Sequence, residues 1–533
     1  MYLNRLLTAI MKKIAIILTL AAFAAPFPAG AELTEGQQKA VRNIERAMSI
    51  MDAVWSRSIK GNANNMYLAD TYNLTNRNSG GSSDVWPYTA VIEAHNSILE
   101  ALDAAKDIAP DLYEENHEKY TTQLGQLIDN LEYYRGTYDL ASYATQAKPC
   151  SPFAVPRSNR KGGANVTGIL NVYDDQMWLA RELIRAYRIT GNEDYLDEAT
   201  YLTDYVLEGW DCWRDEKGEE YGGITWGPGY NSKHACSNSP IIQPLVWLSD
   251  IYSPTDETME YYYRDNNNEV VMEIVNRGEH YLNFAKKVYA WQKKKLLHSS
   301  GCYWDMMGAD GTIRVVDGYR QHVDTGGPTG NQYSYNTGTM IAGAAELYRV
   351  TDDQSYRDDL SKTSKASLSQ FASYKRSQGT YLFNTDKKAT EGFNSWFNDV
   401  LMRSYADAYP YCDNSSAKTG LESFQTNLDY AYDNYLRNGF LPINFLDGWG
   451  DENITKGFHQ SAFASEYGVL AQWLLSLEEN EENAVIASLR EAAETNPMVY
   501  SIWGTKVGNY LNVKDSLPRN IYIVNSKKVL LGH

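Results

Sequence analysis

The sequence predicts an all-α protein: a toroid of six helical hairpins, the (α/α)6 arrangement, followed by a small C-terminal elaboration. Six segments open with polar or aromatic residues and continue as a helical pattern, and one of them recurs later in the chain. Repeated hairpins bury their apolar faces only against their neighbours, so a chain of this length can form one domain. The six helix starts lie at Trp86, Asp174, Asn238, Tyr335, the segment 393–396 and Gly457.

The chain begins with a segment typical of a secretory signal peptide, residues 1–31. Basic residues precede an apolar run over 14–27, and the small residues at 29–31 predict a cleavage site. The run is too short for a comfortable membrane span, and no cysteine near the cleavage site indicates a lipid anchor. We therefore expect a secreted or periplasmic protein without a membrane anchor. Its toroid should occupy 32–495, with a C-terminal extension over 496–533 packed on the same domain.

Charge and composition restrict the class of ligand. The formal net charge is −18 and the mature chain has no basic block, which argues against nucleic acid or an anionic membrane as a partner. The 41 tyrosines and 13 tryptophans supply flat faces suited to sugars, although each can equally pack one helix against another. The five cysteines show no metal-binding spacing and no disulfide framework, and one or two bridges stay open. We expect a monomer with a neutral ligand.

Helical and loop patterns alternate along the chain. Helices are predicted at 35–56, over 86–134 and at 270–297, with polar loops at 61–83 and 149–166. These loops precede helix starts, so we expect them to gather at one mouth of the toroid.

Two later loops and the tail interrupt the helical pattern. Residues 221–238 predict a glycine-rich hairpin or loop, and 302–330 predict a loop with short strand signals. Segments 500–503 and 520–524 in the tail look extended. The aspartates of the second loop match no calcium-binding consensus, so we expect them to be solvated turn residues. They are Asp305, Asp310, Asp317 and Asp324.

Two adjacent carboxylates, Asp174 and Asp175, open a strongly patterned helix. Apolar residues follow Gln176 at mostly helical spacing, which predicts that the pair lies in the N-terminal turn. Aspartate is among the commonest helix-capping residues and also complements the helix dipole. Taken alone, the pair is therefore explained as a cap.

An internal repeat weakens that explanation. The segment 187–197 recurs as 348–358, and the same offset places Asp174 and Asp175 on Tyr335 and Asn336. The same kind of hairpin can thus begin without any acid. The comparison suggests that the aspartate pair has a purpose other than capping.

Glycosidic bond cleavage is the chemistry that needs two carboxylates close together. In retaining enzymes the two groups lie roughly 5–5.5 Å apart, a separation that consecutive side chains can reach. Neighbouring negative charges resist joint ionisation, and the group better supplied with helix N–H donors stays charged. We expect Asp174 to be ionised and Asp175 to carry the proton.

The segment 171–180 resembles the tandem-Asp signature of glycoside hydrolase family 76, the endo-acting α-1,6-mannanases. The resemblance implies that Asp174 is the nucleophile and Asp175 the acid/base. The likeness extends over roughly 84–475, and its further matching segments are 222–226, 237–238, 335–338 and 344–348. The sequence departs from the family at 394–397 and in long inserts at 253–275 and 311–332, which bear on linkage and chain-length preference.

The leading hypothesis is a retaining glycoside hydrolase that cleaves α-1,6-mannosidic linkages within mannan, without metal or organic cofactor because two carboxylates suffice. A secreted glycan-binding protein without turnover is one alternative, although it has no need of paired acids. Another is an (α/α)6 glycosidase or transglycosylase of other sugar specificity. Five residues at helix entries are candidates for substrate binding, and each can equally be structural: Trp226, Asn238, Tyr335, Asn336 and Trp396.

Overall fold

The structure is a computed structural model that describes residues 33–531 with several gaps. Its contacts divide the chain into two units, one over Ala40–Gln472 and one over Leu33–Lys39 with Trp473–His533. The predicted signal peptide at 1–31 lies outside the described residues. The gaps are 309–310, 384–393, 413–414, 445, 451–452, 496–497, 502–505, 511–519 and 525–526.

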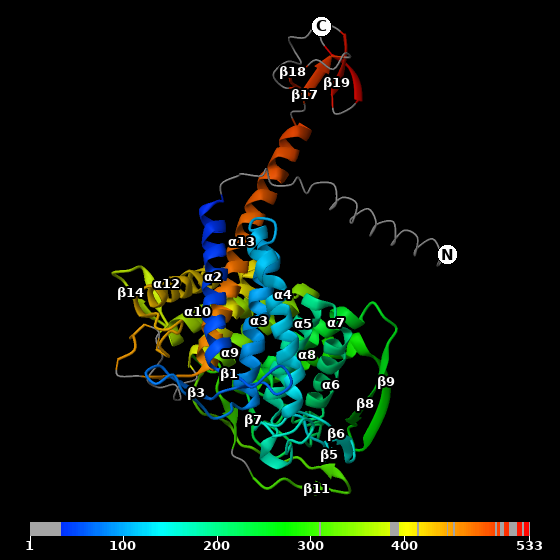
Figure 1. The fold of residues 1–533 in the computed structure, drawn as a ribbon. Coiled ribbons are helices and arrows are strands. Elements are labelled where there is room, and N and C mark those ends of the chain that lie inside the picture. Colours follow the sequence, from blue (N-terminus) through cyan, green and yellow to red (C-terminus); the bar gives the residue numbers. More distant parts are fainter. Residues whose placement is uncertain are drawn as a thin grey trace. The chain divides into compact units, whose positions relative to one another are not determined.

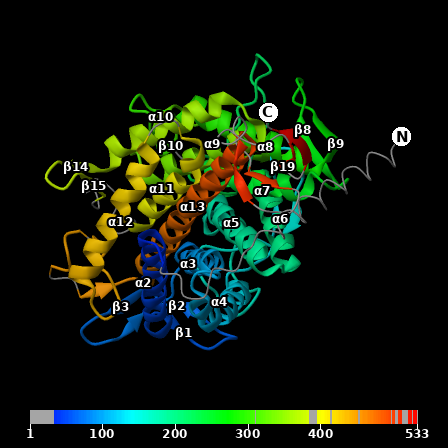
Figure 2. The same ribbon diagram turned by 90° about the horizontal axis from the view of Figure 1, so that it is seen from above.

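The larger unit is mostly helical, as predicted (Figure 1). Five helices contact one another in chain order, and each pairs with the helix that follows it. In Figure 2 the first helix of each pair lies inside and the second lies farther out. The inner helices are α3 (Val85–Ala105), α5 (Tyr173–Thr190), α7 (Ile242–Tyr252), α9 (Ser334–Thr351) and α11 (Asn394–Ala408). Their partners are α4 (Pro110–Asn130), α6 (Glu193–Leu207), α8 (Arg277–Leu296), α10 (Gln354–Phe371) and α12 (Ser416–Tyr435), while α2 (Glu35–Arg57) begins the series and α13 (Gly457–Thr495) ends it.

The sequence repeat corresponds to the connectors of two hairpins, α5–α6 and α9–α10. Gly191 and Asp352 end the first helix of each pair in the left-handed conformation, with φ of 69° and 55°. In both, the N–H of that residue donates to the carbonyl four residues earlier, at 2.7 and 2.8 Å. Asn192 and Asp353 then cap the second helix by accepting the backbone N–H two residues on. The repeat therefore encodes one kind of turn twice.

Helices α9 and α11 approach each other closely at Gly338. A Cβ on this glycine would lie 2.9 Å from the Cα of Leu401 and 3.0 Å from the carbonyl oxygen of Val400. Both are backbone atoms, which cannot move without shifting α11. The absence of a side chain at Gly338 therefore sets the distance between the two helices.

Gly338→Val is expected to lower the free energy of unfolding by about 1–3 kcal/mol, because the added side chain meets the backbone of α11. Urea denaturation of the purified chain measures the change. Gly327→Val is the matched control, since a Cβ there has no atom within 4 Å. Equal unfolding midpoints for the two variants would contradict the close packing of α9 on α11.

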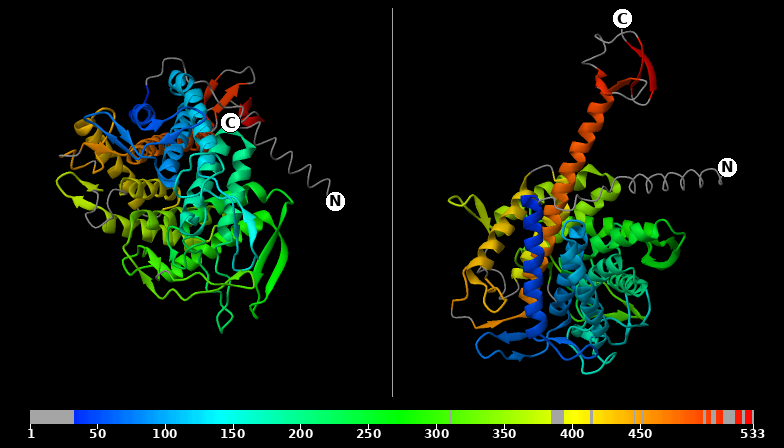
Figure 3. Two further views of the ribbon diagram at one scale, coloured as in Figure 1. Left: turned by 60° about the horizontal axis from the view of Figure 1, so that its bottom comes forward. Right: turned by 45° about the horizontal axis from the view of Figure 1, so that its top comes forward.

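Short strands connect the helices. Those of the entry loops gather at one end of the helices of this unit (Figure 1), the end turned forward in the left view of Figure 3. Two antiparallel sheets have three strands: β13 (Pro328–Thr329), β10 (Met306–Met307) and β7 (Lys233–His234), and β16 (Ile454–Thr455), β3 (Thr71–Asn73) and β4 (Ser79–Gly80). The two-stranded pairs are β1 (Ile59–Lys60) with β2 (Tyr67–Leu68), β5 (Tyr138–Leu140) with β6 (Lys148–Cys150), β8 (Thr258–Arg264) with β9 (Val270–Asn276), β11 (Val315–Val316) with β12 (Tyr319–Arg320), and β14 (Ser373–Lys375) with β15 (Thr380–Leu382).

The helix predicted over 270–297 is wrong in its first seven residues. Residues Val270–Asn276 form strand β9, paired in register with β8, and helix α8 starts only at Arg277. Asn276 ends the strand and caps the helix by accepting the backbone N–H of Glu279. The β-branched residues of this stretch find a partner strand in the preceding segment, which a helical pattern alone does not reveal.

The smaller unit contains a four-stranded antiparallel sheet in the order β18–β17–β19–β20. Val499 and Val524 pair across two of its strands, and both are buried. The extended structure predicted at 520–524 is confirmed, and that at 500–503 is confirmed for its first two residues, the others lying outside the described part. The strands are β17 (Met498–Ser501), β18 (Lys506–Asn509), β19 (Asn520–Val524) and β20 (Lys527–Leu531).

All five cysteines are free thiols, and four of them are buried. None of the disulfide bridges that the sequence left open is formed. No helix in the described part of the chain has both the length and the apolar character needed to cross a bilayer.

Candidate active site

Asp174 and Asp175 lie in the first turn of α5, as the sequence predicts, but neither is its N-cap. The residue before the helix is Val172, whose side chain makes no capping hydrogen bond. Oδ1 of Asp174 accepts the backbone N–H of Asp175 at 3.0 Å. A helix-capping role therefore explains only this one hydrogen bond of Asp174, and it does not explain the presence of Asp175.

Asp174 is the carboxylate with hydrogen-bond donors. Besides the backbone N–H of Asp175, it accepts the indole Nε1–H of Trp226, at 3.2 Å from Oδ2, and the thiol of Cys236. Burial raises the pKa of Asp174 to about 6, and these donors, by stabilising the charged form, keep it from rising further.

Asp175 lacks comparable partners. Its side chain is 7% exposed, and its carboxyl makes no hydrogen bond to a residue that the structure describes. Burial raises the pKa of Asp175 well above its ordinary value, and the charges of Asp174 and Asp84 raise it further. The unequal surroundings therefore favour the charge on Asp174 and a shared proton on Asp175.

A buried asparagine fixes the loop that presents Trp226. Asn238 is fully buried, and its side chain bonds to both the N–H and the carbonyl of Ile224, at 2.8 and 2.9 Å, and to the carbonyl of His234. The ring of Trp226 stacks on His234 with centroids 4.6 Å apart, and its carbonyl accepts the N–H of Tyr173. Asn238 thus holds the loop, while Trp226 contacts the acid pair.

Tyr335 and Asn336 occupy in α9 the positions that the aspartates occupy in α5. The hydroxyl of Tyr335 donates to the thiol of Cys236, which in turn donates to Asp174. Asn336 is fully buried, and its Nδ2 donates to Oδ1 of Asp305 at 3.2 Å. The repeat therefore places the phenol of Tyr335 beside the acid pair and the buried amide of Asn336 behind the pair, against Asp305.

Asp305 departs from the prediction of a solvated turn residue. It is only partly exposed, and burial raises its pKa to about 6, against the lowering effect of the hydrogen bond from Asn336. Its charge also acts on Cys236, so a third acid lies near the pair. Within the described residues, no three His, Cys, Asp or Glu side chains are grouped to hold a metal ion.

Trp396 lies under an aromatic cluster rather than on its open face. It is 2% exposed, and its ring meets the edges of Trp86 and Trp178 at centroid distances of 5.0 and 4.9 Å. Its indole N–H donates to Oε2 of Glu93 at 2.9 Å. The partly exposed aromatic residues packed against the cluster are Trp86, Trp226 and Tyr333.

Of the seven residues that the sequence singled out, four come together: Asp174, Asp175, Trp226 and Tyr335. Asn238, Asn336 and Trp396 are buried behind them. Sequence analysis missed Cys236, Asp84, Trp86 and Asp305 as members of the site. Trp86 carried a signal, since it starts a helix like the others, whereas nothing around Cys236 distinguishes it from the other four cysteines.

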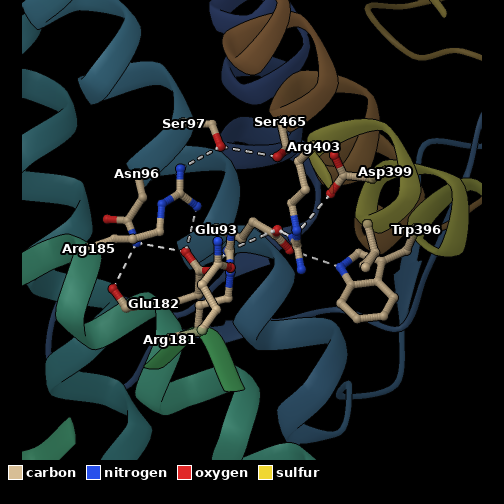
Figure 4. A network of polar contacts seen from close by, with 12 residues as sticks. Glu93, Asn96, Ser97, Arg181, Glu182, Arg185, Trp396, Asp399, Arg403 and Ser465 are labelled. Atoms are coloured by element: carbon tan, nitrogen blue, oxygen red, sulfur yellow. Dashed lines mark hydrogen bonds and ion pairs between the residues drawn. The ribbon is translucent and has the colours of Figure 1, made fainter. Parts of the chain in front are cut away.

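A buried charge network lies deeper along the inner helices (Figure 4). Glu93 of α3 bonds to Trp396 and pairs with Arg181 of α5 and Arg403 of α11. One position after Arg181, Glu182 pairs with Arg181 and with a second arginine of α5, and it accepts Nδ2 of Asn96 at 2.9 Å. Because successive turns of α5 carry Asp175, Trp178 and then these charges, the network fixes the helix that carries the acid pair. Its remaining labelled members are Ser97, Arg185, Asp399 and Ser465.

Two adjacent carboxyls in unequal surroundings, beside partly exposed aromatic rings in a helical frame, are the arrangement that a glycoside hydrolase needs. The family is shown by the sequence itself. The model of glycosyl hydrolase family 76 matches residues 158–260 and 272–455, more than half of the chain, and the protein belongs to that family.

Solved structures share the fold. A family 76 mannosidase from Bacteroides thetaiotaomicron VPI-5482 superposes with a TM-score of 0.59 at 18% identity, covering 82% of this chain and 100% of that one. A family 76 glycoside hydrolase from a bovine Bacteroides thetaiotaomicron strain gives 0.58 at 19% identity, covering 81% and 79%. An inactive variant of an α-1,6-mannanase from a Salegentibacter species, with two consecutive aspartates changed to alanine and α-1,6-mannotetrose bound, gives 0.53 at 20% identity, covering 81% and 99%. The search of curated proteins returned no match.

Proposed function

We propose that the protein is a retaining glycoside hydrolase that cleaves α-1,6-mannosidic linkages within mannan. The observation that carries the proposal is the unequal environment of two adjacent carboxyls, Asp174 with three donors and Asp175 with none among the described residues. The Salegentibacter mannanase supports it, because its variant with two consecutive aspartates replaced is described as inactive and holds α-1,6-mannotetrose.

In the proposed mechanism Asp174 attacks the anomeric carbon while Asp175 gives its proton to the departing glycosidic oxygen. The product is a covalent glycosyl–enzyme and a shortened mannan chain. Asp175, now charged, takes a proton from water, which attacks the anomeric carbon and releases Asp174. Trp226 and Cys236 stabilise the charge on Asp174 before attack and after release.

The proposed sugar contacts are the aromatic residues nearest the acid pair. Trp226 and the largely buried Tyr335 lie at the pair, and the partly exposed rings of Trp86 and Tyr333 extend the same aromatic surface. We assign Asn238, Asn336 and Trp396 supporting roles, because their polar atoms are engaged inside the protein.

We further propose that the hairpins close into an (α/α)6 toroid. Two contacts of α13 support closure. Ser465 lies 3.1 Å from Ser97 of α3, and His459 bonds to Ser395 of α11. We also propose a signal peptide at 1–31, a domain at 32–495 with an extension at 496–533, a secreted or periplasmic location, and a monomeric state.

The experiment mixes the purified mature chain with α-1,6-mannan, α-glucan and β-mannan and measures new reducing ends. Short mannose oligomers released from α-1,6-mannan alone support the proposal, and NMR of the fresh product reads the retained α configuration. Release from another polymer would indicate a different specificity. Binding without product would instead indicate a glycan-binding protein.

Trp226→Phe is expected to move the acid limb of the kcat/KM profile to higher pH. The indole N–H stabilises the charged form of Asp174, so its loss raises the pKa of that carboxyl above about 6, and the nucleophile becomes protonated earlier as the pH falls. Rates on a mannan oligosaccharide between pH 4 and 8 measure the shift. Trp247→Phe is the control, because it removes an equivalent indole bond to Glu346 away from the pair. An unmoved limb would contradict the assignment of Asp174 as the group that must be charged.

A further inference from the structure

A cavity that the acid pair does not line lies beneath the β8–β9 hairpin. Its volume is about 330 Å³, at the lower end of the range typical of ligand pockets. Its walls come from β8, from α6 and the residues just after it, from α8 and from the β5–β6 loop, and none of the residues assigned above to the active site lines it.

The outer wall of this cavity is an addition to the family pattern. The family match stops at residue 260 and resumes at 272, so the unmatched residues include the second half of β8 and the tip of the hairpin. Tyr261 and Tyr262 of this part line the cavity. The hairpin stands at the side of the larger unit (Figures 1 and 3), and its exposed side chains include Tyr262, Met272 and Ile274.

Aromatic rings and paired charged groups make up most of the lining. Trp210, Tyr261 and Phe284 contribute apolar faces. The cations are paired with acids: Lys148 with Glu208, and Arg277 with Asp204 at 3.0 Å. A third acid, Glu260, accepts the hydroxyl of Tyr262 at 2.7 Å. A cavity with flat rings and paired charges favours a neutral, hydroxyl-rich ligand over an anion or a purely apolar one.

His280 supplies an unused polar group in this wall. It is 8% exposed, its ring packs on Tyr261 and Phe284 at 4.5 and 5.5 Å, and it makes no hydrogen bond to a residue that the structure describes. Burial, together with the charges of Lys287 and Arg277, lowers its pKa to about 4. A neutral imidazole offers one donor and one acceptor, which matches a sugar hydroxyl.

We propose that this cavity is a second carbohydrate site, which binds a short stretch of α-1,6-mannan away from the bond being cleaved. The choice of mannan rests on the function proposed above. Tyr261 and Phe284 supply the faces for a sugar ring, and His280 binds a hydroxyl. A polymer held at both sites gains avidity that a short oligosaccharide does not.

The binding test uses the full mature chain carrying Asp174→Ala and Asp175→Ala, so that α-1,6-mannotetraose is not consumed. Calorimetry is expected to show two binding events, of which Tyr261→Ala and His280→Leu each weaken one about fivefold or more. Tyr374→Ala, which removes an exposed tyrosine from the β14–β15 hairpin, should leave both events unchanged. A single event in the parent chain, or two unchanged events in both cavity variants, would overturn the proposal.

Kinetics separates this proposal from the function on which it rests. In the otherwise unaltered chain, Tyr261→Ala should lower kcat/KM on the polymer relative to that on the tetrasaccharide, and Tyr374→Ala should not. Mannan cleavage with an unchanged ratio would refute the second site alone. Binding that depends on Tyr261, in a chain that releases nothing from mannan, would refute the proposed hydrolysis and retain the second site.

Discussion

Replacement of Asp174 by alanine should reduce kcat on α-1,6-mannan by about 10³-fold or more, because no other group can form the covalent intermediate. Asp175→Ala should reduce it by about 10²- to 10⁴-fold, the usual contribution of a positioned acid and base. Reducing-end assays on the purified variants measure both losses. Unchanged melting temperatures would assign the losses to chemistry rather than to folding.

The two variants should differ in their response to the leaving group. An aryl α-mannoside with an acidic phenol departs without a proton, so Asp175→Ala should form the intermediate from it at nearly the native rate, and added azide should then release that intermediate. Asp174→Ala should remain inactive on the same substrate. Asp139→Ala, at an exposed position of β5, is the control for loss of a carboxylate. If Asp175→Ala slowed the aryl substrate as much as mannan, Asp175 would not be the proton donor.

Glu182→Ala should cause the largest loss of stability, about 3–5 kcal/mol in the free energy of unfolding. Glu182 is 2% exposed and pairs with Arg181 and with Arg185, whose Nη1 lies 2.8 Å from its carboxylate. Its removal leaves two buried guanidinium groups without that charge. Urea denaturation measures the loss, and Glu422→Ala, which breaks an exposed pair with Lys418, should cost at most about 1 kcal/mol.

The contribution of Glu182 to the free energy of unfolding should depend on pH, and the direction follows from the pKa of its carboxyl. Burial acts to raise it, but the charges of Arg185 and Arg181 outweigh burial and lower it below its ordinary value. A carboxyl with a lowered folded pKa contributes stability above its unfolded pKa and loses it as the pH falls through the folded value. The gap in stability between the native chain and Glu182→Gln should therefore narrow on acidification. A gap that is constant down to the acid transition would show that Glu182 is not charged in the folded state.

The sequence predicted the acid pair and its partner tyrosine because both rest on a repeat. Asp174 and Tyr335 take the same place in two hairpins, so one offset located them together. The repeat could not predict which residues at a helix start are buried, since a helical start fixes the order of residues but not which of them face the interior. Trp396 and Asn238, at two such starts, proved to be interior residues.

Cys236 and Asp305 were missed for a different reason. Cys236 follows β7 and Asp305 precedes β10, and the pairing of these two short strands brings Asp305 near Cys236, which bonds to Asp174. No local sequence pattern predicts a strand of only two residues. The error at 270–276 has the same origin, because those residues become a strand only through pairing with β8.

The hairpins that share a connector differ at their far ends, where one carries two acids and the other a phenol and an amide. In α5 the 18 residues between these ends span about 27 Å. The acid pair and the connector thus lie at opposite ends of one helix. Substitutions at the end that carries the acids can therefore change the chemistry without disturbing the connector. A repeated hairpin can then support a neighbouring hairpin instead of carrying out the same reaction.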